Sequence, residues 1–591
     1  MDTGGFFLVQ GLMEHQAFGP EQFSEMQVEF GKAAEDFALQ EILPRKGEIE
    51  QFNPDLTRQL MKQCGELGLL GVDVPEQYGG LDLDKVTSAL LAERITLGES
   101  ASFTVTFSAH TGIGTLPIVY FGNEKQKEFY LPKLASGEWI SSYALTEPGA
   151  GSDALAIRTI ARLSEDGQYY ILNGNKQFIS NGGWANLLIT FAKIDGDKLT
   201  AFLIDPTSEG VIRKEEKNKL GLHGSSTCNV ILENVKVPVE NVLGTIGDGA
   251  AIAFNSLDIG RFKLGASVLG GCKTTLREAI PYALERRQFG QPIAYFDAIR
   301  KKFADMLIRT FALESIVYET AHLLDESIAT VQPDSPTYST EVAHAIERYA
   351  IECSVCKIYG SEALWQNADD GLQIFGGYGY IEDYPMAQIL RDTRIDRIYE
   401  GTNEINRQII TGYLMKKTLL EELPLREKMK ETEAVLAGKM PPLPDWELGE
   451  EERAVELAKH LLLIIYRYAL TEFGQDLQHE QQVGEIISDA VSDIFIMQTT
   501  LSRIRQYNGP DSLRHYLLAI GKVLVAETTL RMHQNAYLAL HHILPENNRS
   551  EALKQWQYLG NAMLLSTDTM KLKQELAELL YRTKDYPYHR I

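Results

Sequence analysis

The sequence predicts an α+β protein made of a helical domain, an antiparallel β domain, a helical bundle and an additional helical domain, in that order. Three observations support this fold class. The chain has 591 residues, its apolar residues change from helical to strand-like spacing near residue 139, and helical spacing returns near residue 251. At about 150 residues per domain, the length alone indicates roughly four domain-sized units.

The composition is that of an ordinary globular protein with a strongly acidic balance. Hydrophobic residues make up 44% of the chain and charged residues 23%, which is typical of neither disordered nor membrane-spanning chains. The formal net charge of -24 repels phosphate backbones, so we expect no nucleic-acid partner. Five cysteines are too few for a disulfide framework and indicate a reducing compartment.

We recognise no targeting signal at either end of the sequence. Residues 1–9 include an acid where a secretory signal or transit peptide has positive charge. The last residues form neither a peroxisomal tripeptide nor a prenylation box. The longest apolar stretch, Leu461 to Tyr466, is far shorter than the ~20 residues that cross a bilayer. We therefore expect a cytoplasmic protein.

Residues 1–138 are predicted to form the N-terminal helical domain. Apolar residues recur three and four positions apart, as in Phe23, Met26 and Phe30, which is the spacing of an amphipathic helix. The run Pro-Glu-Gln-Tyr-Gly-Gly at 75–80 interrupts this pattern and predicts a long loop.

Residues 139–250 are predicted to form the middle β domain. Short β-branched or aromatic segments at 169–172, 187–191, 200–204 and 229–232 are separated by Asn-Gly, Asp-Gly and Gly-Gly turns. The connections are too short for helical crossovers, so an antiparallel sheet is expected.

Helical spacing then predicts a bundle over residues 251–415. Pro441, Pro442 and Pro444 mark a linker at 416–444, and amphipathic helices over 445–591 predict the additional helical domain.

Two motifs suggest chemistry that their context does not support. Residues 149–154, Gly-Ala-Gly-Ser-Asp-Ala, fit a dinucleotide fingerprint, but Pro148 precedes them and the following segment is hairpin-like. A tight turn is the plainer interpretation, although its backbone N–H groups could approach a phosphate. Cys353 and Cys356 share a helix face without a second ligand pair, so we expect two core thiols and no metal site.

The densest group of candidate functional residues lies between Gln373 and Arg407. Gly376 and Gly377 follow a long helical segment and would let a flat ligand approach closely. Glu400 follows two apolar residues, and Thr402 is a candidate N-cap for a helix over 404–415. A poorly solvated Glu400 would have a raised pKa and could act as a base. A solvent-exposed acid at a helix start is the alternative, and these residues leave both open.

Four segments together resemble the acyl-CoA dehydrogenase family. They are 143–153 (YALTEPGAGSD), 178–183 (FISNGG), 286–290 (RRQFG) and 373–402, in the family's order and at its spacing. The resemblance covers about residues 20 to 415. It implies the family's fold, which is a helical domain, a β middle domain and a four-helix bundle. It also implies FAD as cofactor and an acyl-CoA thioester as substrate.

The resemblance places Glu400 at the family's catalytic base, in the motif Ile-Tyr-Glu-Gly-Thr. It implies that Glu400 removes the α-proton while the β-hydrogen leaves as hydride to flavin N5, giving trans-2-enoyl-CoA. The Glu400 N–H and a flavin hydroxyl would polarise the thioester oxygen. A minority of the family carries its base on another helix, but the corresponding position here is Gly260, which favours Glu400.

The family's FAD contacts fall on a larger set of positions. Thr146, Phe178 and Ser180 would line the isoalloxazine, while Arg286 and residues 373–377 would reach the adenosine diphosphate end of a neighbouring subunit's FAD. The full set implied is Tyr143, Thr146, Gly151, Ser152, Phe178, Ile179, Ser180, Arg286, Gln288, Phe289, Gln373, Gly376, Gly377, Thr402 and Glu404. Phe178 departs from the family's usual Trp, so the flavin edge is expected to be less shielded.

Substrate contacts follow from the same resemblance. Ser152, Asp258 and Arg261 match positions near the CoA portion. Val105 and Ala109 fall where medium-chain members have bulkier residues that close the acyl pocket, which implies a longer tunnel here.

The length beyond residue 415 and the Gly-Gly-Phe-Phe-Leu lead-in at 4–8 resemble the very-long-chain subgroup. In that subgroup a helical C-terminal domain replaces one dimer contact of the usual tetramer, so a homodimer is expected. The segment 416–439 combines basic residues with leucines. It could lie on the inner face of a membrane as a peripheral contact, or it could be a flexible linker.

Three functions are compatible with this resemblance. The first is a long-chain acyl-CoA dehydrogenase of fatty-acid β-oxidation that passes electrons to an electron-transferring flavoprotein. The second is an acyl-CoA oxidase, which the missing peroxisomal ending disfavours. The third is a non-catalytic or DNA-protecting flavoprotein of the same fold, which the acidic total disfavours. We therefore expect the dehydrogenase.

Overall fold

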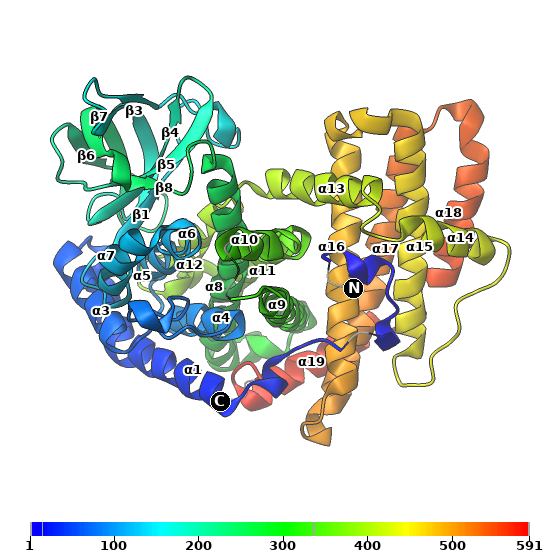
Figure 1. The fold of residues 1–591 in the computed structure, drawn as a ribbon. Coiled ribbons are helices and arrows are strands. Elements are labelled where there is room, and N and C mark those ends of the chain that lie inside the picture. Colours follow the sequence, from blue (N-terminus) through cyan, green and yellow to red (C-terminus); the bar gives the residue numbers. More distant parts are fainter. Residues whose placement is uncertain (1–2, 15, 334, 336, 589–591) are drawn as a thin grey trace.

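The computed structural model describes residues 3–14, 16–333, 335 and 337–588 (Figure 1). Residues 1–2 and 589–591, on which the expectations about the two ends partly rest, lie outside this range. Within the described part of the chain, no helix is both long and apolar enough to cross a membrane.

Seven α-helices form the described part of the N-terminal domain. They are α1 (Glu25–Phe37), α2 (Lys46–Glu50), α3 (Pro54–Glu66), α4 (Lys85–Ile95), α5 (Ala101–Ala109), α6 (Leu116–Phe121) and α7 (Glu124–Ala135). Side chains such as Ser24, Asp84 and Ser100 cap these helices by accepting a backbone N–H of the first turn. The predicted loop at 75–80 lies between α3 and α4.

The middle domain is a sheet at one end of the molecule, above α6 and α7 in Figure 1. Its strands are β1 (Ser141–Ala144), β2 (Ile160–Leu163), β3 (Tyr169–Ser180), β4 (Leu187–Ile194), β5 (Lys198–Ile204), β6 (Val211–Glu215), β7 (Thr227–Pro238) and β8 (Val242–Leu243). The strand order is β6-β7-β3-β2-β4-β5-β8, with β1 also paired to β4.

The sheet is mostly antiparallel, as predicted, but two of its pairings are parallel. β4 pairs in parallel with both β1 and β2, whereas β2–β3 and β4–β5 are antiparallel. A short connection fixes only the direction of strands that follow each other along the chain. β4 follows neither β1 nor β2 directly, so the turn pattern could not predict these two pairings.

The helical bundle contains the long central helix of the molecule. Its elements are α8 (Gly249–Glu285), the hairpin β9 (Arg287–Gln288) and β10 (Gln291–Pro292), α9 (Asp297–Ala329), α10 (Tyr338–Glu347), α11 (Ala350–Phe375), α12 (Pro385–Thr393) and α13 (Asn403–Leu419). α8 packs against α4, α9 and α11. Cys353 and Cys356 of α11 are both buried free thiols, as predicted.

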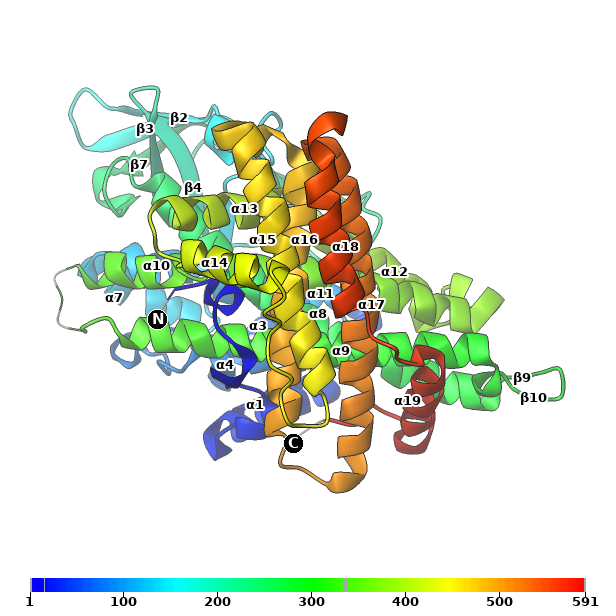
Figure 2. The same cartoon turned by 90° about the vertical axis from the view of Figure 1, so that its right-hand side faces the viewer.

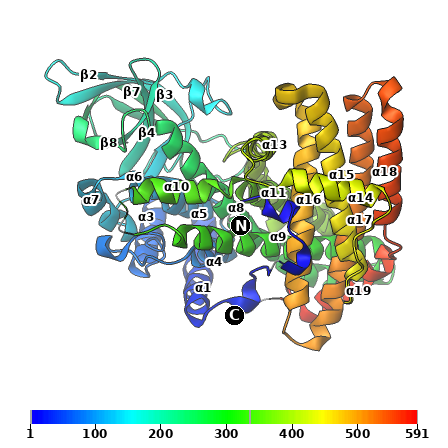
Figure 3. The same cartoon turned by 45° about the vertical axis from the view of Figure 1, so that its right-hand side comes forward.

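The appended helices stand beside the bundle (Figures 2 and 3). They are α14 (Leu425–Leu436), α15 (Gly449–Phe473), α16 (Gln481–Gln506), α17 (Asp511–Ile543), α18 (Arg549–Met563) and α19 (Thr569–Thr583). α13 continues past residue 415 to Leu419, and α14 occupies much of the segment expected to be a linker. α16 packs against α9 and α13, and α19 packs against α9.

A buried ionic network joins the bundle to both ends of the chain. Arg503 of α16 pairs with Glu314 of α9 at 2.7 Å and with Glu21 at 2.8 Å. The hydroxyl of Tyr586 donates to Glu314 at 2.7 Å. Burial alone would raise the pKa of Glu314, but Lys273 and Arg503 hold it below its ordinary value. Buried charges are tolerated when they are paired in this way, so the appended helices are fixed to the bundle.

Candidate active site

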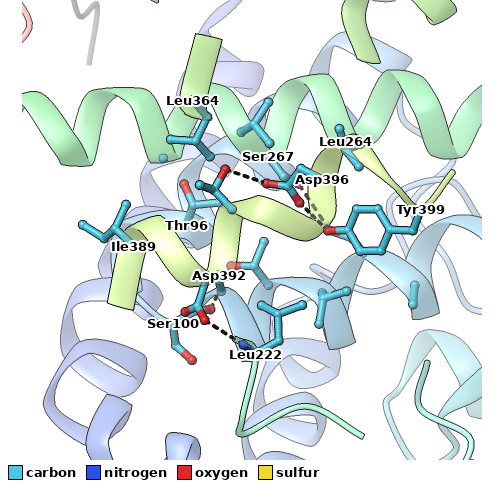
Figure 4. A pocket seen from close by; sticks show the side chains of 18 of the residues that line it. Thr96, Ser100, Leu222, Leu264, Ser267, Leu364, Ile389, Asp392, Asp396 and Tyr399 are labelled. Carbon is cyan, nitrogen blue, oxygen red and sulfur yellow. Dashed lines mark hydrogen bonds between the residues drawn. The ribbon is translucent and has the colours of Figure 1, made fainter. Parts of the chain in front are cut away.

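A cavity lies between the N-terminal domain and the bundle (Figure 4). It contains about 1220 Å³ of empty space, part of it open to solvent. Val105 and Ala109 of α5 lie in its wall, together with Ser180, Tyr399 and Glu400. One face of α8 forms another wall, through Gly260, Leu264, Ser267, Val268, Gly271 and Thr274.

The backbone at Glu400 makes a sharp turn into α13. Glu400 and Gly401 both have positive φ, 56° and 78°, a conformation that costs energy for a residue other than glycine. Thr402 then caps α13, because its hydroxyl accepts the N–H of Ile405 at 3.2 Å. The predicted cap is confirmed, and the turn places the Glu400 side chain in the wall of the cavity.

The Glu400 carboxyl group has the environment of a base rather than of a solvated surface acid. Its Oε2 is buried and has no hydrogen-bond partner among the described residues. Burial raises the pKa of Glu400 to about 7, although Arg261 and Lys357 act in the opposite direction. A base with a pKa near the working pH exchanges a proton readily in both directions. The alternative of an exposed helix-start acid is therefore wrong.

Arg261 and Asp258 lie behind Glu400 and do not line the cavity. The Arg261 guanidinium pairs with Asp258 at 2.6 Å, and its Nε donates to the Glu400 carbonyl oxygen at 3.4 Å. Asn406 donates to the carbonyl oxygen of Gly401 at 2.9 Å. Burial raises the pKa of Asp258 to about 6, against the effect of Arg261. In this structure Asp258 holds Arg261 in place, and Arg261 in turn holds the turn that carries Glu400.

The predicted flavin-facing residues lie on β1, β3 and the segment between β1 and β2. Phe178 has a φ of 59° and is 57% exposed, at a point where the pairing of β3 with β7 shifts register. The Thr146 carbonyl accepts the N–H of Gln177 at 2.8 Å. Ile179 and Tyr143 are buried, so their side chains face the protein interior and only their backbone is available to a ligand.

The glycine motif at 149–154 forms a turn, as the plainer interpretation predicted. Glu147 and Ala150 exchange backbone hydrogen bonds of 3.1 and 3.0 Å. Gly151 and Ser152 are exposed and do not line the cavity. A Cβ atom at Gly151 would meet no atom within 4 Å, which leaves space for a ligand beside the backbone.

A second cavity, with about 860 Å³ of empty space that is partly open to solvent, contains another part of the predicted set. Arg286, Gln288, Gly376 and Gly377 line it, with the Tyr378 ring 5.5 Å from the Arg286 guanidinium. None of these residues lines the first cavity. One chain therefore contains the predicted cofactor residues in two separate places.

The three remaining predicted cofactor positions are exposed. Gln373 is exposed at the end of α11 and does not line the second cavity. Phe289, at the tip of the β9–β10 hairpin, is 94% exposed. Glu404 is exposed in the first turn of α13.

Several cavity residues were not anticipated from the sequence. Leu264, Ser267, Val268 and Gly271 repeat at helical spacing on one face of α8, and Ile389 comes from α12. Small and apolar residues at spacings of three and four were the available signal, but that pattern also describes any core-facing helix. No group of three or more metal-ligating side chains occurs among the described residues.

Comparisons with known proteins point to one family. Three family models match in order: the N-terminal domain of acyl-CoA dehydrogenases at 24–138, the middle domain at 142–235 and the C-terminal domain at 247–415. A probable acyl-CoA dehydrogenase of Bacillus subtilis is 43% identical over 504 residues, or 85% of this chain and 84% of that protein. A mitochondrial very long-chain specific acyl-CoA dehydrogenase of Macaca fascicularis is 38% identical over 62% of this chain and 54% of that protein.

Solved structures show the same relationship. The structure of an acyl-CoA dehydrogenase complexed with FAD from Bacillus anthracis superposes with a TM-score of 0.95 at 40% identity, covering 99% of this chain and 100% of that one. Butyryl-CoA dehydrogenase from Megasphaera elsdenii superposes with a TM-score of 0.60 at 34% identity, covering 67% of this chain and 99% of that one. The appended helices are therefore matched in the first structure, which covers nearly the whole chain.

The helical, β and helical order of the domains, matched by the three family models, is that of the flavin-dependent acyl-CoA dehydrogenases. The chain belongs to the acyl-CoA dehydrogenase family. It is an oxidoreductase that uses FAD, and the predicted family, fold and cofactor are confirmed.

The residues of this chain fit FAD. Phe178 is an exposed aromatic residue on β3, two residues before Ser180, which lines the first cavity. The second cavity combines a guanidinium group, the Tyr378 ring and two glycines whose Cβ positions are open, Gly376 and Gly377. Such groups can bind a pyrophosphate and an adenine ring.

Proposed function

We propose that this enzyme converts long-chain acyl-CoA thioesters to trans-2-enoyl-CoA in fatty-acid β-oxidation, with Glu400 as the catalytic base. The observation that supports this most strongly is the buried, unpartnered Oε2 of Glu400 in the wall of the first cavity. Val105 and Ala109, which stand where medium-chain members have bulkier residues, line that cavity, and this favours a long acyl chain.

The reaction requires the loss of a proton from the α-carbon and of a hydride from the β-carbon. Ionised Glu400 takes the α-proton on its unpartnered oxygen, and the electron pair of the broken C–H bond forms the new double bond. The Glu400 N–H donates to the thioester oxygen and stabilises the developing enolate charge. FAD, when bound, accepts the hydride. Arg261 and Asn406 hold the carbonyl groups of the turn, so the carboxyl group does not need to reorganise.

The flavin ring would be held by residues beside the first cavity. Phe178 would stack on it, and Thr146 and Ser180 would contact its polar edge. Tyr143, Gly151, Ser152 and Ile179 would contribute backbone or hydroxyl groups nearby. Thr402 and Glu404, at the start of α13, would reach the remainder of the cofactor.

We further propose a homodimer, because the second cavity is separate from the first. Arg286, Gln288, Gln373, Gly376 and Gly377 would bind the adenosine diphosphate end of the FAD held by a second copy of the chain. Phe289, almost fully exposed at the hairpin tip, would pack into that copy. The appended helices cover one face of α9 and α13, so that face is not available for a tetramer contact.

We propose an electron-transferring flavoprotein as the electron acceptor and the cytoplasm as the location.

The segment around α14 exposes three leucines, Leu419, Leu420 and Leu443, whereas Leu425 and Val435 of α14 are buried. The exposed leucines, rather than α14 itself, are the candidates for contact with the inner face of a membrane.

The CoA portion would be contacted by Ser152. Arg261 and Asp258 would act near it by holding the turn at Glu400.

The decisive experiment is anaerobic mixing of the FAD-loaded enzyme with palmitoyl-CoA. We expect the flavin absorbance to bleach, trans-2-hexadecenoyl-CoA to form, and the flavin to reoxidise slowly in air but rapidly with electron-transferring flavoprotein. Rapid peroxide production in air would instead identify an acyl-CoA oxidase. An absence of bleaching with every straight-chain acyl-CoA would rule out the proposal.

A further inference from the structure

We propose that the far end of the acyl cavity is closed by three charged residues, Lys46, Glu99 and Arg277, and that this charged gate sets the longest acyl chain the enzyme accepts. The inference rests on the proposed function, because it takes the cavity to hold the acyl chain. Lys46 belongs to α2, Glu99 follows α4 and precedes α5, and Arg277 belongs to α8.

The cavity runs lengthwise between α5 and α8, which are antiparallel. A Cβ atom at Gly260 would lie 3.1 Å from Ile113, just beyond α5. Further along, the hydroxyls of Ser267 and Ser108 are 3.3 Å apart. Arg277 then reaches Glu99, just before α5, at 2.8 Å. At 1.5 Å per residue, Gly260 and Arg277 are separated by about 25 Å along α8.

Glu400 marks the reacting end of this cavity, because it contacts the Gly260 position. Figure 4 shows Tyr399 and Leu264 on one side of the cavity and Thr96, Ser100 and Ile389 on the other. A thioester placed at Glu400 therefore directs its acyl chain along α8 toward the charged gate.

Apolar and hydroxyl-bearing side chains share the lining of this path. Ala109, Leu264 and Val268, with Ser108 and Ser267, lie nearer Glu400, whereas Thr96, Ser100 and Thr274 lie nearer the gate, where Lys46 and Glu99 add charge. Each methylene buried against apolar side chains strengthens binding about fourfold. Methylenes pressed against hydroxyls and charges gain nothing, because those groups would lose water or their ionic partners.

The gate forms a boundary between the cavity and solvent. Lys46 Nζ lies 2.7 Å from Glu99 Oε2, and Arg277 binds the other carboxylate oxygen. The side chains of Lys46 and Arg277 are 38% and 28% exposed, whereas Glu99 is 12% exposed. Glu99 has a φ of 55°, so the backbone turns sharply where it presents the carboxylate to both cations.

The test measures binding, so that it does not depend on turnover. FAD-loaded Glu400→Gln protein, which cannot take the α-proton, is titrated calorimetrically with saturated acyl-CoAs from octanoyl- to docosanoyl-CoA. The series is repeated with Lys46→Met or Glu99→Ala added. Lys301→Met is the matched control, because Lys301 also pairs with a carboxylate, Asp305, at 2.7 Å on an exposed surface of α9.

We expect affinity to rise about fourfold per methylene up to a limiting length and then stop. Lys46→Met and Glu99→Ala move that limit to longer chains, and Lys301→Met does not. The same limiting length in all four proteins would overturn the gate. Because Lys46 is partly exposed, its replacement is compatible with folding and supports the test if Glu99→Ala is unstable. Failure of the wild-type enzyme to bleach with palmitoyl-CoA would instead overturn the proposed function, whatever the binding series shows.

Discussion

A Cβ atom at Gly260 would lie 2.5 Å from Oε2 of Glu400 and 2.9 Å from its Cδ. The helix position that corresponds to the alternative base site of the family is thus occupied, in space, by the Glu400 carboxyl group. Any side chain at residue 260 would compete with Glu400 for the same volume. The two base positions exclude each other in this protein.

Gly260→Ala is expected to lower kcat with little effect on FAD content. The added methyl group displaces the carboxyl group, and a misplacement of about 1 Å can cost on the order of 100-fold in rate. Steady-state kinetics with palmitoyl-CoA measures the effect. Gly412→Ala on α13, where a Cβ meets nothing within 4 Å, is the control and should turn over normally. Equal rates for both variants would refute the steric relationship.

Glu400→Gln is expected to lower kcat by about 100-fold to 10,000-fold, the usual contribution of a general base. The protein should stay yellow, because Glu400 is not needed to hold FAD. Stopped-flow bleaching of the flavin by palmitoyl-CoA measures the chemical step directly. Normal bleaching by this variant would show that another residue removes the α-proton.

The pH dependence follows from the raised pKa of Glu400, about 7. Only the ionised carboxyl group is a base, so kcat should rise about tenfold per pH unit below pH 7 and level off above it. A pH profile of single-turnover bleaching tests this. A profile that is flat from pH 5 to pH 8 would argue against Glu400.

The raised pKa of Glu400 also affects the free energy of unfolding. A rise in pH should lower this contribution to stability, whereas it should increase kcat. The folded state binds the Glu400 proton more tightly than the unfolded state, in which the pKa is 4.5. Its favourable contribution is therefore complete below pH 4.5 and is lost as pH rises to about 7. Glu400→Gln should raise the melting temperature more at pH 8 than at pH 5.

Arg261→Met should destabilise the fold, because it leaves Asp258 buried without its partner. Removing one member of a buried ion pair costs about 3–5 kcal/mol. Urea unfolding measures this loss, and adding Asp258→Asn should restore part of it, since no unpaired charge remains. If the double variant is no more stable than Arg261→Met, the ion pair does not account for the loss.

A mixture of two defective variants should regain activity when their subunits exchange to form mixed dimers. Arg286→Met would weaken FAD binding in the other subunit's site, and Glu400→Gln would disable its own site. A mixed dimer then has one intact site, so refolding an equal mixture should give up to about a quarter of wild-type activity. Mixing that recovers no activity would contradict the shared cofactor site.

The order of domains was predictable because spacing and turn residues are local signals. The environment of Glu400 was not, since Gly260, which makes room for it, lies on a distant helix. The resemblance predicts Arg261 and Asp258 near CoA, a prediction that stays untested, and their burial against the Glu400 turn could not be read from the sequence. Lys46, Glu99 and Arg277 are ordinary surface-type residues in the sequence, and only the packing of α2 and α8 around the start of α5 brings them together.

The buried ion pairs of Glu314 link the stability of the appended helices to that of the bundle. Its partners Arg503 and Tyr586 come from the C-terminal part of the chain, and Arg503 is shared with Glu21 near the N-terminus. A chain shortened to the catalytic core would keep Glu314 on α9 but lose both of these partners. The core of this enzyme is therefore not a detachable module, and the bundle and the appended helices should lose their structure in one cooperative transition.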